Sequence, residues 1–113
     1  MLTNRWWNDA LQSGSKFVPI VPTNWDPRPR AEHPVPWTDE GPEHFIQPTA
    51  QELQNLVTSS IELTCTNQTA IDAQTVLFYA WNESSENGAA LIPSLGNGTY
   101  YVRALAEILP ATC

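Results

Sequence analysis

Basic side chains are scarce in this chain of 113 residues. Five Lys and Arg residues stand against twelve Asp and Glu residues, which gives a net charge of −7 at pH 7. After residue 48, Arg103 is the sole basic side chain in the sequence. An acidic surface repels nucleic-acid phosphates and anionic lipid headgroups. The charge balance therefore predicts no nucleic-acid partner and no membrane-surface partner.

Long apolar runs are also lacking. No stretch approaches the ~18–20 apolar residues that cross a bilayer. The first residues, MLTNRWWNDALQ, lack the apolar segment of a secretory signal. The sequence thus predicts a chain that is made and kept in a cytoplasm.

Two cysteines and three glycosylation patterns are interpreted in the light of that compartment. Cys65 and Cys113 are expected as free thiols. The alternative is a disulfide, which would stabilise the fold by roughly 4 kcal/mol by closing the loop between them. Asn67, Asn82 and Asn97 each start an Asn-x-Ser/Thr pattern. In a chain rich in Asn, Ser and Thr these patterns are interpreted as chance matches.

Chemical motifs are nearly absent. The sequence has no Gly-rich phosphate loop, no G-x-S-x-G and no Cys–His arrangement of a nucleophilic site. His33 stands outside any zinc-ligand pattern. Asp39, Glu40, Glu43 and His44 cluster in sequence, but they lack calcium-loop spacing, so a solvated acidic loop is favoured. The sequence predicts no catalytic residue, no metal site, no cofactor and no enzymatic activity.

Proline, in contrast, is concentrated in residues 17–48, which hold eight of the ten prolines and two of the five tryptophans. Proline fixes its own φ and pushes the preceding residue towards extended conformations. The division predicted is an extended N-terminal arm over 1–48 and a small domain over 49–113. A unit of this size is marginal alone, so we expect a partner or a homo-oligomer to stabilise it.

Large apolar side chains recur along the arm. Trp7 and Leu11 share one face of a short helix expected within residues 3–12, and we expect this segment to dock through the pair Trp6-Trp7. A sugar-binding aromatic platform is the alternative for that pair. The next anchors along the arm are Trp25, Trp37, Phe45 and Ile46. Anchors at intervals suit a strap whose aromatics each fill one pocket of a partner. The predicted partner-binding residues are Trp6, Trp7, Phe17, Ile20, Trp25, Trp37 and Phe45.

The second half contains one helix signal and several strand patterns. Thr49-Ala-Gln-Glu52 is a capping box, which predicts a helix over about 50–57 that Ser59-Ser60 ends. Alternating apolar and polar residues predict strands after it. For the second strand a helix is the alternative. The predicted strands are 61–66, 75–81, 89–92 and 99–108, with turns at 82–88 and 94–98.

The stretch TVLFYAWNESSENGAALIPSLGNGTYYVRALAE resembles the second half of an immunoglobulin-like or fibronectin-type β-sandwich. In that family an aromatic strand and a polar hairpin precede a strand reading G-T-x-Y-x-V-x-A. The resemblance implies a mainly β fold: a small, reduced immunoglobulin-like β-sandwich with one short helix and a long extended Pro/Trp-rich N-terminal arm. It also implies a tyrosine-corner hydrogen bond from Tyr100 or Tyr101. Because the chain offers too few strands, the sandwich would be completed by the arm or by a neighbouring chain.

The organisation of the sequence resembles small accessory virion proteins of tailed bacteriophages, of the capsid decoration, cement or neck/tail adaptor type. The resemblance implies a non-enzymatic structural protein, made in the host cytoplasm and located in the virion. Its arm would strap onto neighbouring subunits such as the major capsid protein. One alternative is a carbohydrate-binding β-sandwich module with Trp81, Tyr100 or Tyr101 on the sugar. Another is a regulatory or inhibitory protein whose acidic surface covers a basic partner.

Overall fold

The computed structural model describes residues 2–39, 41–79, 91–110 and 112–113. The predicted immunoglobulin-like β-sandwich is wrong, because the described residues form four helices and only two strands of two residues each. The elements, in chain order, are α1 (Leu2–Gln12), β1 (Ile20–Val21), α2 (Arg28–Glu32), α3 (Ala50–Thr66), β2 (Leu77–Phe78) and α4 (Tyr100–Ala106).

Helix α3 starts where the sequence predicts it. The Thr49 hydroxyl accepts a hydrogen bond from the Glu52 backbone N–H at 3.2 Å, and the Glu52 carboxylate accepts one from the Thr49 backbone N–H at 2.8 Å. This reciprocal capping box satisfies two of the backbone donors that a helix start leaves open. Its hydrogen bonds also lower the pKa of the Glu52 carboxyl. The predicted helix start is therefore confirmed.

The predicted end of this helix, and the strand predicted over 61–66, are wrong. Helix α3 continues to Thr66, and Ser60 and Thr64 lie on its buried face. The Ser60 hydroxyl donates to the Val57 carbonyl at 2.7 Å, and the Thr64 hydroxyl donates to the Ser60 carbonyl at 2.8 Å. Because these hydroxyls are satisfied within the helix, they can be buried without a penalty for an unpaired group. Ser60 thus continues the buried stripe.

The strand predicted over 99–108 is also wrong, because most of it forms helix α4. Tyr101, Ala104 and Leu105 are buried, and their i, i+3, i+4 spacing is that of one helix face. The side-chain amide of Gln54 on α3 donates to the Ala104 carbonyl at 2.6 Å and to the Glu107 carboxylate at 3.0 Å. These bonds fix the end of α4 on α3.

Two other strands were predicted, over 75–81 and 89–92, and the described residues contain only part of the first. Of 75–81 only β2 is a strand, and it pairs with β1 in parallel, with Ile20 opposite Leu77 and Val21 opposite Phe78. The prediction over 89–92 lies partly outside the described residues. Leu91 is buried there, and no strand includes Leu91 or Ile92. The turn predicted over 82–88 lies wholly outside the described residues.

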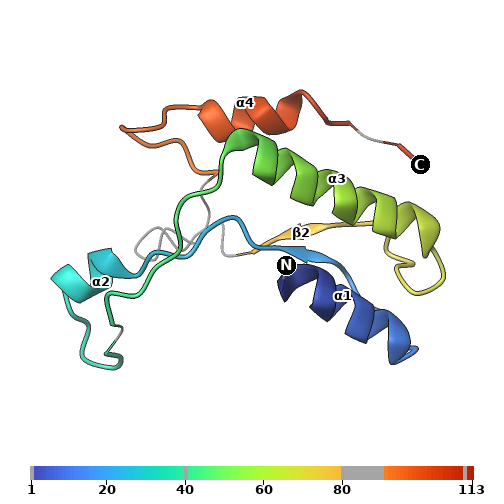
Figure 1. Ribbon diagram of the computed structural model, residues 1–113, viewed down its shortest axis with the longest axis horizontal. Coiled ribbons are helices and arrows are strands. Elements are labelled where there is room, and N and C mark those ends of the chain that lie inside the picture. The colour runs from blue at the N-terminus through green and yellow to red at the C-terminus, as the bar shows by residue number, and fades with distance from the viewer. Residues whose placement is uncertain (1, 40, 80–90, 111) are drawn as a thin grey trace.

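The elements stack around α3. In Figure 1, α4 lies along one side of α3, and the β1–β2 ribbon and α1 lie on the other side. Trp7 of α1 and Val21 of β1 belong to the same buried cluster as residues from α3 and α4. Parts of the predicted arm thus pack in one core with the predicted domain. The full cluster is Trp7, Val21, Leu53, Leu56, Val57, Leu91, Tyr101 and Leu105.

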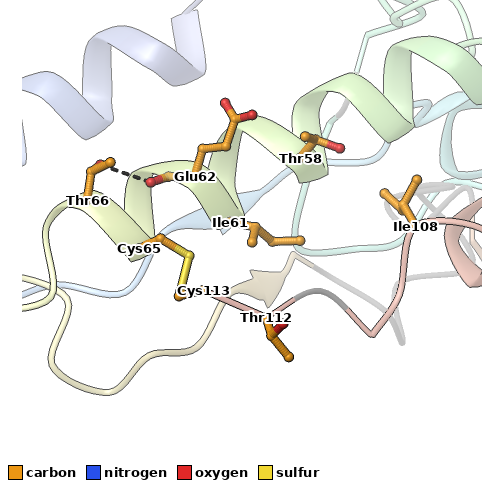
Figure 2. A pocket seen from close by; sticks show the side chains of 8 residues that line it. All are labelled: Thr58, Ile61, Glu62, Cys65, Thr66, Ile108, Thr112 and Cys113. Atoms are coloured by element: carbon orange, nitrogen blue, oxygen red, sulfur yellow. Dashed lines mark hydrogen bonds between the residues drawn. A yellow bond between two sulfur atoms is a disulfide. The ribbon is translucent and has the colours of Figure 1, made fainter.

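A disulfide joins Cys65, near the end of α3, to Cys113. The expectation of free thiols is therefore wrong. The two residues are 48 positions apart, and no local sequence pattern marks them as partners. The bond ties the segment that follows α4 back to the far end of α3, as Figure 2 shows. The protein thus has a covalent tie that a small core needs.

Candidate protein-binding site

A segment between β1 and α3 lies apart from the core. We call residues 28–47 the display loop; residue 40 lies outside the described residues. It begins with α2, a helix of five residues that contributes no buried side chain. Figure 1 shows α2 and the chain after it on the far side of the molecule from the β1–β2 ribbon and α1. The predicted extended arm is thus interrupted by one helical turn. This helix accommodates Pro29 because the proline stands in its first turn.

The start of the display loop is fixed by a carboxylate. Asp26 is buried, and its two carboxylate oxygens accept hydrogen bonds from Arg28 Nε at 2.7 Å and from Arg28 Nη2 at 2.6 Å. This paired geometry holds the pKa of the Asp26 carboxyl at about 2, below its ordinary value of 3.8. The chain direction at the first turn of α2 is therefore set by an ion pair with two hydrogen bonds.

The end of the display loop is fixed by three further hydrogen bonds. The Phe45 backbone N–H donates to the Trp25 carbonyl at 2.9 Å, which closes the base of the loop. The Tyr101 hydroxyl donates to the Pro48 carbonyl at 2.6 Å, and the Asn97 side-chain amide donates to the Gln47 side chain at 3.3 Å. Burial raises the pKa of the Tyr101 hydroxyl, so this donor keeps its proton. The base of the loop is thus closed between Trp25 and Phe45, and its end is held by Tyr101 of the core.

Between these fixed ends the loop exposes large apolar side chains. Trp37 is 76% exposed, Phe45 is 66% exposed and Ile46 is 92% exposed. The same segment contains Glu32, Asp39, Glu40 and Glu43, whereas residues 31–47 contain no Lys or Arg. The display loop therefore combines exposed apolar groups with negative charge.

The structure divides the seven residues predicted to bind a partner. Trp37 and Phe45 are together on the display loop. Trp7 is buried in the core at 6% exposure, and Phe17 packs against it. The remaining three are Trp25, half-buried at the base of the loop, and Trp6 and Ile20, exposed on α1 and β1.

Two residues of this site stand outside the predicted partner-binding set, although Ile46 was expected as an anchor of the arm. Ile46 is more exposed than Trp37 or Phe45, and Tyr101 of α4 holds Pro48 at the end of the loop. The tyrosine-corner resemblance had singled out Tyr101 as a donor to backbone, but for a sandwich that the structure does not contain. For Ile46 the signal was its place next to Phe45 in a proline-rich segment with no helix or strand periodicity.

Two hollows of nearly equal volume reach the disulfide. One measures about 540 Å³, and the described residues of its lining, such as Val76 and Phe78, include no ionisable side chain. The other lies between α3 and the C-terminal segment. It measures about 550 Å³, and its lining is mostly apolar, with Ile61 and Ile108 on two sides (Figure 2). Glu62 is the one ionisable side chain among the described residues of the lining. Without a second titratable group there is no acid–base pair here. This hollow therefore offers no chemistry that would make it an active site.

Of the three residues predicted as alternatives for sugar binding, Tyr100 is 53% exposed and Tyr101 is not exposed. Tyr101 is buried and stands edge-to-face against Tyr100, with ring centroids 5.1 Å apart. Trp81 lies outside the described residues. A stacking platform needs an open aromatic face, and Tyr101 does not provide one.

Two further site classes were sought in the part of the chain that the structure describes. There, no group of three or more His, Cys, Asp or Glu side chains is placed to hold a metal ion. No helix in the same part is long and apolar enough to cross a membrane. Comparisons with protein-family models, with curated proteins and with solved structures found no match to this chain. The functional argument therefore depends on the display loop itself.

Proposed function

We propose that this chain is a non-enzymatic binding protein that attaches to a partner protein through the display loop. The observation that carries this proposal is the exposure of Trp37, Phe45 and Ile46 on a segment whose base is closed by the Phe45–Trp25 hydrogen bond and whose end is held by Tyr101 of the core. Exposed side chains on a fixed loop can enter pockets without a large ordering cost. Binding and stability are thus separated: the loop binds and the core folds.

The partner that suits this loop is a protein with an apolar pocket and a basic rim. Aromatic anchors dominate binding energy when a pocket desolvates them. The acidic side chains of the loop, and the net charge of −7, favour Lys and Arg around that pocket and repel a second copy of this chain. The proposal thus commits to a basic protein surface and departs from the homo-oligomer that the sequence predicted.

The proposal is tested by site-specific photo-crosslinking followed by affinity measurement. A photoreactive phenylalanine analogue at position 37 is expected to capture the partner, whereas the same analogue at position 6 is expected not to. Trp6 is the matched control because it is also an exposed tryptophan, 63% exposed, but stands on α1. With the captured protein purified, Trp37→Ala should weaken binding by ~2 kcal/mol, which is roughly 30-fold in Kd.

Two outcomes would count against the proposal. One is an equal loss of affinity for Trp37→Ala and for the control Trp6→Ala. The other is a Trp37→Ala variant that unfolds more easily than the wild type, since loss of binding would then reflect loss of structure. A fall in association rate with rising salt is the expected sign of the basic rim.

A place in a bacteriophage virion, on the major capsid protein or a tail subunit, is one form of this function and stays a prediction from the sequence. A virion would supply a large protein surface to which the display loop could bind. The carbohydrate-binding sandwich is not proposed again, because its fold is absent from the described residues.

A further inference from the structure

A short turn beside the display loop carries the sequence Asn97-Gly98-Thr99. Ser94 and Gly98 pair across this turn through two backbone hydrogen bonds, and the Asn97 backbone N–H donates to the Ser94 hydroxyl at 3.1 Å. Gly98 has a positive φ of 52°, and a Cβ at this position would meet nothing within 4 Å. The turn therefore has open space around it.

Asn-x-Thr is the acceptor pattern for N-linked glycans, and the chain holds three such patterns. Eight Asn and eighteen Ser and Thr residues in a chain of 113 make about one chance match. Three patterns exceed this expectation. The Cys65–Cys113 disulfide adds an independent observation, because disulfides form and persist in oxidising compartments, and the endoplasmic reticulum lumen is both oxidising and glycosylating.

The folded structure distinguishes Asn97 from Asn67. A side-chain amide has two N–H groups, and a glycan replaces one of them. Asn67 uses its amide nitrogen twice, donating to the Leu63 carbonyl at 3.0 Å and to the Thr66 hydroxyl at 2.9 Å at the end of α3. A glycan on Asn67 would remove one of these two bonds. Among the described residues, the amide nitrogen of Asn97 donates one hydrogen bond, to Gln47, so a glycan there leaves a donor for it.

Thr99, the hydroxyl residue of the acceptor pattern, is also accessible. Thr99 is exposed, and its side chain makes no capping hydrogen bond to α4, although it stands at the N-cap position. Thr99 is therefore exposed, and Asn97 is half-buried in the same turn. Asn82, the third candidate, lies outside the described residues.

We infer that Asn97 is an acceptor for an N-linked glycan. This requires passage through a secretory pathway that makes such glycans, and it replaces the prediction that the chain is kept in a cytoplasm. In the transfer, the amide Nδ2 of Asn97 bonds to the anomeric carbon of a lipid-pyrophosphate-linked oligosaccharide. The bond from that carbon to the pyrophosphate breaks, the lipid pyrophosphate leaves with the electron pair, and the amide loses one proton. This inference is independent of the display loop. A glycosylated chain would not be a bacteriophage protein, so the two predictions exclude each other.

The test produces the full chain behind a cleavable secretion leader in a eukaryotic host. Intact mass is measured before and after peptide-N-glycosidase, which leaves aspartate at each glycan position, and peptide mapping then locates that residue. Four variants accompany the wild type: Asn97→Gln, Asn67→Gln, Thr99→Ala and Thr99→Ser. Thr99→Ser is the matched control, because it changes the same residue and retains the acceptor pattern. Circular dichroism checks that each secreted variant is folded.

The wild type and Thr99→Ser are expected to carry a glycan at position 97. Asn97→Gln and Thr99→Ala are expected to lose that glycan, and Asn67→Gln is expected to keep it. A secreted, folded wild type with the bare polypeptide mass would overturn the inference. So would a glycan found at position 67 with position 97 unmodified.

Discussion

Removal of the disulfide should weaken the fold without changing its helices. In the chain-entropy model a cross-link between positions 48 apart removes enough freedom from the unfolded chain to stabilise the protein by about 4 kcal/mol at 25 °C. The double variant Cys65→Ser/Cys113→Ser should therefore lose about 4 kcal/mol of unfolding free energy. That is a large share of the roughly 5–15 kcal/mol typical of a small domain. The melting temperature should fall by roughly 15 °C or more.

The assay is urea unfolding followed by tryptophan fluorescence and circular dichroism, with and without reductant. Reductant should weaken the wild type and leave the double variant unchanged. Native circular dichroism should be the same for both, because α3 and α4 remain joined through the hydrogen bonds of Gln54. A double variant as stable as the oxidised wild type would refute the reasoning.

Three further predictions test the core, the ion pair and the loop. Trp7→Ala should lower the free energy of unfolding by about 3–5 kcal/mol, because Trp7 is 6% exposed. Trp6→Ala should lower it by less than about 0.5 kcal/mol. Equal losses would contradict the assigned core. The Asp26 carboxylate stabilises the fold above its ordinary pKa of 3.8, and this contribution should be lost as pH falls towards about 2. Asp26→Asn should flatten that part of the pH–stability curve, and an unchanged curve would show that the pair with Arg28 contributes nothing. In limited proteolysis, the first cleavages should fall within residues 28–47. The two fragments should stay associated, because Trp7 of the N-terminal fragment belongs to the core cluster. Loss of the whole N-terminal fragment would contradict the shared core.

The sequence predicted the start of α3 but not its extent. The Thr49–Glu52 capping box is a local signal, and the structure contains it. The second half of α3 was hidden because Ser60 and Thr64 occupy buried positions, where a pattern search expects apolar residues. Their hydroxyls donate to carbonyls about one turn earlier. A search for the spacing of apolar residues, at the period of a strand or of a helix, cannot detect such bonds.

Helix α4 shows a second reason for the wrong fold. The segment that contains Tyr101 and Leu105 fits both an alternating pattern and an i, i+4 pattern. Tertiary contacts with α3, such as the bond from Gln54 to the Ala104 carbonyl, decide between the two. The disulfide depends in the same way on the fold, which brings Cys113 back to α3.

The candidate site was predictable in part. Proline density located the segment without regular structure, and Trp37 and Phe45 were singled out within it. Hydrophobicity alone cannot tell an anchor for a partner from an anchor for the core. Trp6 and Trp7 are adjacent and identical in type, yet one is exposed and the other buried, because successive helix positions face different sides.

Hydrogen exchange of the chain alone and in complex tests the central claim most directly. The protein captured by crosslinking at position 37 serves as the partner. The account predicts that binding slows amide exchange within residues 28–47 and leaves α3 and α4 unchanged. Slower exchange confined to α3 and α4, with no change in the display loop, would contradict it.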